Sequence, residues 1–147
     1  MRPDSVDNAD LDRSACMEAA TSSMNDDETT IFQLRQVVDR FVAERDWHQF
    51  HTPKNLAMSL AIEAAELMEH FQWLTPEQSW QVADRSEKKA EVGEEISDVL
   101  CYLLALANEL KLDLSTALEA KMVKNAEKYP VHRYRGLFGP EDPAGKG

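Results

Sequence analysis

The chain has 147 residues and a formal net charge of −11. This length suits one domain with a core of its own and argues against two full domains. The acidic balance argues against the nucleic-acid backbone and anionic membranes as binding partners, because both carry negative charge themselves.

The first predicted helix covers about residues 30–45, where apolar side chains recur at helical spacing, and residues 46–52 form a connection. Thr52 and Pro53 then supply an N-cap and a first helical residue for the second helix. That helix is expected to end near Trp73.

A short helical segment follows, opened by Thr75 and Gln78, which have the spacing of a capping box. Two more main helices cover about residues 86–110 and 114–129, the last ending before a proline. Because no strand pattern is found, we expect an all-α fold, a bundle of four main helices plus the short segment. The helix at residues 86–110 carries apolar side chains on more than one face, so we expect the bundle to pack as an oligomer.

Two tails are expected around this domain. Residues 1–28 contain eight acidic and two basic side chains and few large apolar ones, so we expect an acidic, disordered tail. The folded domain is placed at residues 29–135, and residues 136–147, rich in Gly and Pro, form a flexible C-terminal tail. The cysteines, Cys16 and Cys101, show no zinc-site or disulfide-framework spacing. With no apolar leader and no stretch of membrane-spanning length, the expected location is cytoplasmic.

Two short motifs on predicted helices place paired carboxylates in the most apolar stretches of the chain. Glu63 and Glu66 are three residues apart, as are Glu95 and Asp98, so each pair shares one helix face. Buried carboxylates that face one another repel or take up protons unless a cation neutralises them. Carboxylate oxygen is the ligand that Mg²⁺ or Mn²⁺ prefers. These four acids are the predicted metal-binding residues.

The alternative is that the acids form the solvated faces of two amphipathic helices. Acidic helical chains contain such pairs by chance. Around Glu63 and Glu66, however, the other sides of the helix carry Ala, Leu, Met or Ile, so the polar stripe is narrow. This pattern favours the metal site over the solvated face.

A basic stripe lies on the last helix, where Lys121, Asn125 and Lys128 stand at offsets of four and seven. Lysine as a point charge and asparagine as an amide donor suit phosphate oxygens held opposite the acids. A solvated basic face that complements the C-terminal helix dipole is the alternative, and spacing alone slightly favours it.

Two tryptophans, Trp47 and Trp73, sit at predicted helix ends beside polar residues. Such positions suit stacking walls for a nucleobase, although a core or interface role is the commoner fate of tryptophan. We assign Trp80 to a core or interface role. No histidine has a Glu three residues before it, and no Walker-type or G-x-S-x-G motif is present, so phosphate chemistry here must depend on a metal.

Taken together, E-x-x-E and E-x-x-D on successive helices, followed by K-x-x-x-N-x-x-K-Y on a third, resemble the MazG-like all-α nucleoside triphosphate pyrophosphohydrolases, and among them the dCTP pyrophosphatase branch. The resemblance spans about residues 31–135. It is carried by these phrases: Phe41-Val-Ala-Glu-Arg-Asp-Trp47, Gln49-Phe50-His51, Glu63-Ala-Ala-Glu66, Phe71-Gln72-Trp73, Glu94-Glu95-Ile-Ser-Asp98, Tyr102, and Lys121-Met122 through Asn125 to Tyr129-Pro130-Val131-His132.

The resemblance implies hydrolysis of a nucleoside triphosphate between its α- and β-phosphates, giving the monophosphate and pyrophosphate in a nucleotide house-cleaning role. It implies a homodimer or homotetramer with sites completed across subunits. The four acids, Glu63, Glu66, Glu95 and Asp98, would be the catalytic residues and would hold Mg²⁺, with Mn²⁺ as a substitute. Trp47, Trp73 and Tyr102 would form the base and sugar pocket, and Lys121, Asn125 and Lys128 would face the phosphates.

One departure bears on the substrate. Some dCTP-preferring members carry a histidine on the first helix where this chain has Val38. An apolar wall discriminates less sharply than a hydrogen-bonding one. The expected substrate is dCTP or a modified dCTP. The rivals are a related enzyme acting on dUTP or phosphoribosyl-ATP, and an inactive helical oligomerisation or regulatory module.

Overall fold

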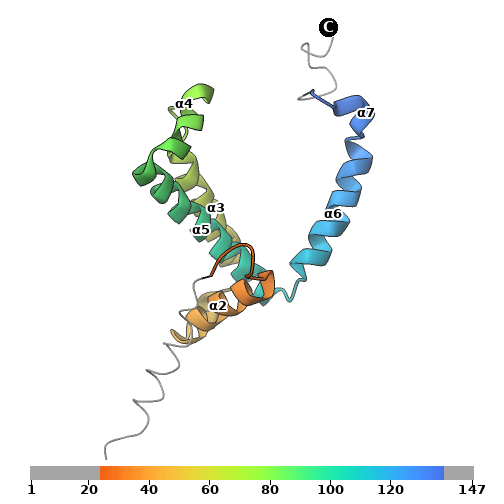
Figure 1. Ribbon diagram of the computed structural model, residues 1–147. Helices are drawn as coiled ribbons and strands as arrows, with labels where there is room; N and C mark the ends of the chain where they lie inside the picture. The colour runs from red at the N-terminus through yellow and green to blue at the C-terminus, as the bar shows by residue number, and fades with distance from the viewer. Residues whose placement is uncertain (1–23, 138–147) are drawn as a thin grey trace, which may run out of the picture.

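The computed structural model describes residues 24–137, which form helices joined by short turns and contain no strand (Figure 1). The all-α class is therefore confirmed. The elements in chain order are α2 (Ile31–Ala43), η1 (Trp47–Phe50), α3 (Pro53–Glu69), α4 (Pro76–Trp80), η2 (Gln81–Asp84), α5 (Ser86–Glu109), α6 (Leu114–Lys128) and α7 (Val131–Tyr134).

The capping residues begin two helices as predicted. The Thr52 side chain accepts a hydrogen bond from the backbone N–H of Asn55, with Pro53 in the first turn of α3. At α4, the Gln78 N–H donates to the Thr75 hydroxyl at 3.3 Å, and the Thr75 N–H donates to the Gln78 side chain at 2.9 Å. Each cap provides a partner for helix N–H groups that otherwise have none.

One predicted helix end is wrong. The helix α3 ends at Glu69, not near Trp73. The N–H groups of Phe71 and Gln72 both donate to the Met68 carbonyl, and the chain then closes into a turn. Trp73 therefore lies in the turn between α3 and α4, and the chain carries it away from the helix axis.

The helices α3 and α5 run antiparallel side by side and form the body of the fold, with α2 crossing one end (Figure 1). Leu56 of α3 and Leu104 of α5 are each only 2% exposed. The other buried apolar residues are Val42, Val82, Val92, Ala105 and Ala107. This core is small for the number of apolar side chains in the chain, because one helix pair offers few positions covered on all sides.

A reciprocal polar clasp fixes α2 to the end of α5. The Arg35 guanidinium donates to the Asn108 side-chain oxygen at 2.7 Å, and the Asn108 amide donates back to the Arg35 carbonyl at 3.1 Å. A second guanidinium nitrogen reaches the Leu112 carbonyl at 2.9 Å, just past the helix end. The clasp places η1, which follows α2, at the same end of the helix pair.

The helix α6 extends away from α3 and α5 (Figure 1). It contains no buried residue. The four main helices and the short segment are all present, but the last main helix does not cover the other three within one chain. The short helix α7, which the sequence analysis did not anticipate, folds back so that the Tyr129 and Tyr134 rings meet edge to face at 5.3 Å.

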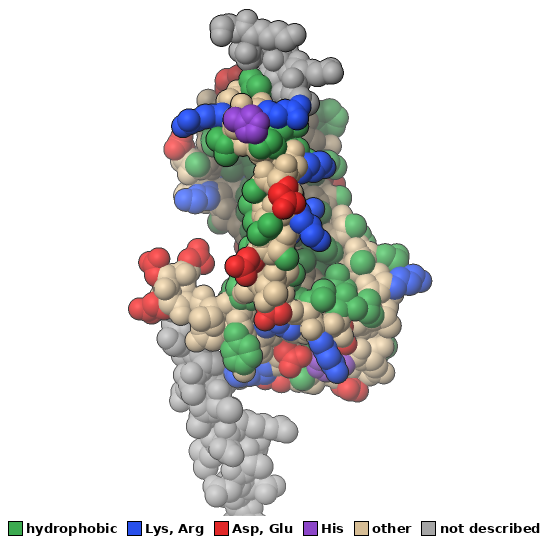
Figure 2. Space-filling model, turned by 90° about the vertical axis from the view of Figure 1, so that its right-hand side faces the viewer, with side chains coloured by type: hydrophobic (Ala, Val, Ile, Leu, Met, Phe, Trp, Pro, Cys, Tyr) green, Lys and Arg blue, Asp and Glu red, His purple; other side chains and the backbone are tan. Residues whose placement is uncertain are grey.

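Many large apolar side chains remain exposed, as expected from the excess on α5. On α5 itself, Ile96 is 51% exposed and Leu103 40%. Trp80 is 81% exposed, so its assignment to the chain's own core is wrong and the interface role stays a prediction. Figure 2 views the molecule from the α6 side, where hydrophobic side chains lie open among acidic and basic groups. Exposed apolar area of this extent is typical of a surface that binds another protein chain.

The predicted tails lie almost wholly outside the described residues. Residues 1–23, with Cys16, and residues 138–147 are not described. Just inside the first boundary, the Thr29 N–H donates to the Asn25 carbonyl and closes a short turn before α2. Between residues 24 and 137, no helix combines the length and apolarity needed to cross a membrane.

Candidate active site

The two acidic pairs lie where α3 faces α5. Carboxylate oxygens of Glu63, Glu66 and Glu95 are all within 4.8 Å of one another. Asp98 lies outside that trio, yet after burial and Glu66 its charge also raises the pKa of Glu63. The antiparallel arrangement produces this meeting, because each helix presents its i, i+3 pair on the face that its neighbour covers.

The exposure of these acids differs from the expectation. Glu63 and Glu95 are half-buried, whereas Glu66 and Asp98 are exposed, and no charged residue in the described part of the chain is fully buried. Between residues 24 and 137, the contact between α3 and α5 covers Glu63 and Glu95 in part and leaves Glu66 and Asp98 open to solvent. Loss of hydration still raises the pKa of Glu63, and the negative charges of its three neighbours raise it further.

This carboxylate cluster has the chemistry of a hard-cation site. Three carboxylates brought within 4.8 Å repel one another when ionised. Partial burial raises the pKa of Glu63, and this repulsion raises it further. A divalent cation would relieve it, and an all-oxygen set suits Mg²⁺ or Mn²⁺. The residues present therefore fit the predicted metal.

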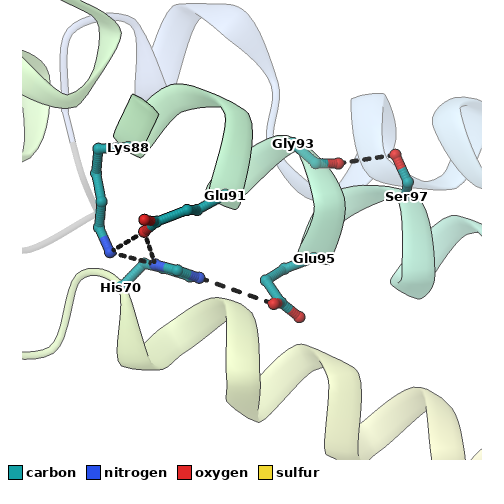
Figure 3. Close-up of polar contacts among 6 residues, drawn as sticks. All are labelled: His70, Lys88, Glu91, Gly93, Glu95 and Ser97. Atoms are coloured by element: carbon teal, nitrogen blue, oxygen red, sulfur yellow. Dashed lines mark hydrogen bonds and ion pairs between the residues drawn. The ribbon is translucent and has the colours of Figure 1, made fainter. Parts of the chain in front are cut away.

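A polar network extends the cluster toward the turn after α3 (Figure 3). The Lys88 ammonium donates to His70 Nδ1 at 2.6 Å and to Glu91 Oε2 at 2.8 Å. The other ring nitrogen of His70 lies 3.9 Å from Glu95 Oε1. The sequence analysis did not assign His70, Lys88 or Glu91 to the site. The signal was nevertheless present, since His70 continues the Glu66 face by one helical turn.

A cavity of about 620 Å³ adjoins this network at the same end of the helix pair. It is lined by His70, Leu74, Gln78, Gln81, Val82, Arg85, Ser86, Glu87, Lys88 and Glu91. The Lys88 ammonium lowers the pKa of Glu91 by hydrogen bonding and charge. His70 lines the cavity and also lies 3.9 Å from Glu95, so it connects the cavity to the carboxylate cluster.

The predicted base-pocket residues are not brought together within one chain. Trp47 begins η1 before α3, and Trp73 follows the other end of α3. A helix of 17 residues spans about 25 Å, so the two rings stand far apart. Trp47 is 43% exposed and packs edge to face on Phe41 at 5.9 Å, while Trp73 is 86% exposed. Tyr102 is half-buried on α5, seven residues beyond Glu95.

The basic stripe likewise lies apart from the acids. Lys121 and Lys128 are exposed on α6, and Asn125 between them is half-buried. The Lys128 ammonium lies 5.1 Å from the centre of the Tyr129 ring, and its hydrogen bond with that residue raises the pKa of Lys128. Because α6 extends away from α3 and α5 (Figure 1), the structure does not place these donors opposite the acids of the same chain.

The comparisons with known proteins identify the family. A protein-family model described as the MazG-like family matches residues 58–137, which contain all four acids and the basic stripe. A pyrophosphatase from Archaeoglobus fulgidus, known from its crystal structure, shares 40% sequence identity and a TM-score of 0.65. The match covers 74% of this chain and 99% of that one.

Curated relatives point the same way. A dCTP pyrophosphatase 1 from Bos taurus is 40% identical over 134 residues, 80% of this chain and 79% of that protein. A dCTP pyrophosphatase 1 from Rattus norvegicus is 44% identical over 109 residues, 74% of this chain and 64% of that protein. The chain thus spans less than two thirds of the rat relative. The matched residues, the identity and the shared fold together show that the chain belongs to the MazG-like family.

Proposed function

We propose that the protein is a nucleoside triphosphate pyrophosphohydrolase that converts dCTP, or a modified dCTP, into the monophosphate and pyrophosphate. The observation that carries this proposal is the cluster of Glu63, Glu66 and Glu95, whose carboxylate oxygens meet within 4.8 Å. The dCTP pyrophosphatase relatives at 40% and 44% identity support the substrate class. Hydrolysis adds water across the α–β anhydride bond, so pyrophosphate leaves and one proton is released.

Four carboxylates, those of Glu63, Glu66, Glu95 and Asp98, would hold Mg²⁺, for which Mn²⁺ is the expected substitute. When bound, the cation supplies positive charge that offsets the negative charge developing on the phosphate oxygens. A carboxylate of the same cluster accepts the proton that the attacking water loses. The half-buried position of Glu63 and Glu95 limits competing water around these groups.

The remaining walls of the site come from a second copy of the chain. Trp47 and Trp73 are separated by the length of α3, and the basic stripe of Lys121, Asn125 and Lys128 lies on the outlying α6. A homodimer, or a homotetramer built from two of them, brings such surfaces onto the carboxylates of a partner. The exposed apolar side chains of α5 and α6 support this assembly. A cytoplasmic house-cleaning role remains part of the proposal.

The cleavage position is tested with a panel of nucleoside triphosphates and Mg²⁺, scored separately for pyrophosphate and orthophosphate. We expect pyrophosphate and monophosphate in equal amounts, with dCTP or a 5-modified dCTP turned over fastest. Val38 presents no polar atom to a base, so the preference among pyrimidines should be modest, because an apolar wall distinguishes bases by only about 1–3 kcal/mol. Orthophosphate as the sole phosphate product would contradict the proposed bond cleavage.

Trp73→Ala tests the stacking role. The side chain is 86% exposed, so its loss should leave the chain's own fold intact. Loss of a base-stacking contact of about 1–3 kcal/mol should raise KM roughly 10-fold and flatten the preference among bases. Steady-state kinetics with three triphosphates, together with circular dichroism, measure both effects. An unfolded or disassembled variant would instead identify Trp73 as a structural anchor.

A further inference from the structure

The polar network beside the carboxylates has an internal order (Figure 3). Lys88 donates to His70 Nδ1 at 2.6 Å and to Glu91 at 2.8 Å. His70 Nδ1 also lies 3.8 Å from Glu91, and Nε2 lies 3.9 Å from Glu95 Oε1. The His70 side chain is 16% exposed and that of Glu95 22%. The four side chains thus form a line from the cavity rim to the carboxylate cluster.

Lys88 determines the tautomer of the His70 ring beside it. A lysine ammonium has three donors and no lone pair, so it donates and Nδ1 accepts. In the neutral ring the proton must then be on Nε2, the nitrogen that faces Glu95. At 3.9 Å this N–H is too far for a direct hydrogen bond, but its positive end still favours one orientation of the carboxylate.

We propose that His70, held in one tautomer by Lys88, is a positioning residue that orients Glu95 for the divalent cation. The proposal deepens the proposed function and rests on the carboxylates binding that cation. Partners that hydrogen-bond metal-ligating side chains set ligand orientation, and their loss weakens metal affinity about 10- to 100-fold. The longer contact at 3.9 Å places the loss expected for His70 at the low end of that range. Glu95 gains most from such a partner, because it is the only member of the three-carboxylate cluster that comes from α5.

A purely structural role is the competing explanation. The same contacts tie the end of α3 to the start of α5, and they would do so without any effect on metal binding. Substituting Lys88 distinguishes the two roles, because they predict opposite changes in cation affinity. Removing a positive charge near an acidic site strengthens cation binding through bulk electrostatics, whereas loss of the tautomer lock weakens it.

The test measures Mn²⁺ binding to the full chain without substrate, from the electron paramagnetic resonance signal of free Mn²⁺. We expect His70→Leu to weaken binding roughly 10-fold, within the range for a lost outer partner, and to broaden the bound spectrum. His70→Gln, whose amide N–H falls near the Nε2 position, should stay within about 3-fold of the parent chain, because the donor is kept. Lys88→Met should weaken binding by a smaller factor than His70→Leu.

The matched control is Lys89→Met, the same change one residue along α5. Lys89 is exposed, and its side chain makes no hydrogen bond or ion pair with residues 24–137. The Lys89→Met variant should bind Mn²⁺ as well as the parent chain or slightly better. Parent-like affinity in a folded His70→Leu, or equal losses in His70→Gln and His70→Leu, would overturn the positioning role. A parent chain that binds no Mn²⁺ would overturn the metal assignment itself, and the positioning role with it.

Discussion

Glu63→Gln should lower kcat/KM roughly 10²- to 10³-fold, the size of loss seen when one preorganised electrostatic group is removed from an active site. The same substitution should raise the melting temperature of the metal-free chain. Glu63 sits among like charges, and one such contact destabilises a helical protein by about 0.2–0.5 kcal/mol, or roughly 1–3 °C for a domain of this size. Activity and metal-free stability therefore move in opposite directions.

The pH dependence of that stabilisation follows from the pKa of Glu63. Burial and the neighbouring carboxylates raise this pKa in the folded chain above its ordinary value. Between the unfolded and folded pKa values the folded chain holds more protons, so its stability falls as pH rises. At neutral pH the ionised group destabilises the parent, and glutamine removes that penalty. Below the ordinary carboxyl pKa the acid is protonated in both states, so the difference should vanish.

Thermal unfolding in a chelator at pH 7 and near pH 3.5 measures this effect, and a Mg²⁺ titration of the melting temperature measures cation binding. Glu69→Gln is the matched control, because Glu69 is exposed on the same helix α3 and belongs to no part of the cluster. It should keep parent activity and the Mg²⁺-dependent rise in melting temperature. A Glu63→Gln protein with near-parent turnover would refute the metal assignment, and losses of activity in Glu95→Gln and Asp98→Asn would support it.

The helices and the meeting of the acids could be predicted from the sequence because both depend on local rules. Thr52 with Pro53 and Thr75 with Gln78 satisfy helix N–H groups within four residues, so their effect needs no tertiary structure. An i, i+3 carboxylate pair on each of two consecutive long helices must likewise share a face. Only the pairing of the two helices had to be assumed, and their antiparallel packing supports that assumption.

What the sequence could not predict depends on packing. Trp73 lies outside α3 because backbone N–H groups donate to the Met68 carbonyl and close a turn there. No side chain in the sequence indicates this turn. Trp80 is 81% exposed because no element between residues 24 and 137 covers it. The His70 network depends on the register between α3 and α5, which fixes Lys88 opposite the ring. Periodicity identifies the faces of a helix, but it does not identify which residues pack against them.

The position of α6 is the strongest structural argument for a shared site. The resemblance implies that Lys121 and Asn125 face the phosphates held by the acids, yet α6 extends away from α3 and α5 in the single chain (Figure 1). The two requirements are met together if α6 of one copy covers the acidic face of another. Glu66 and Asp98, exposed here, would then be covered by that partner helix.

Mixing two inactive variants should restore activity if the site is shared in this way. Glu63→Gln damages the acids and leaves α6 intact, whereas a Lys121→Met, Asn125→Ala double variant damages α6 and leaves the acids intact. We expect each alone to have about 1% of parent activity or less, since each loses charged or hydrogen-bonding groups on the triphosphate. After co-refolding or co-expression in equal amounts, activity should rise to about a quarter of the parent value, as expected for a twofold assembly with exchanged sites.

The quarter follows from counting sites. Random pairing makes about half of the dimers mixed, and in a mixed dimer one site combines both defects while the other combines both intact halves. If acids and α6 of the same chain formed each site, every site in a mixed dimer would carry one defect and no activity would return. Co-expressed Glu63→Gln and Glu95→Gln chains are the control, because both damage the acids and no pairing rebuilds a site. Recovery in that control, or none in the first mixture despite dimers in solution, would contradict a site completed by a partner's α6.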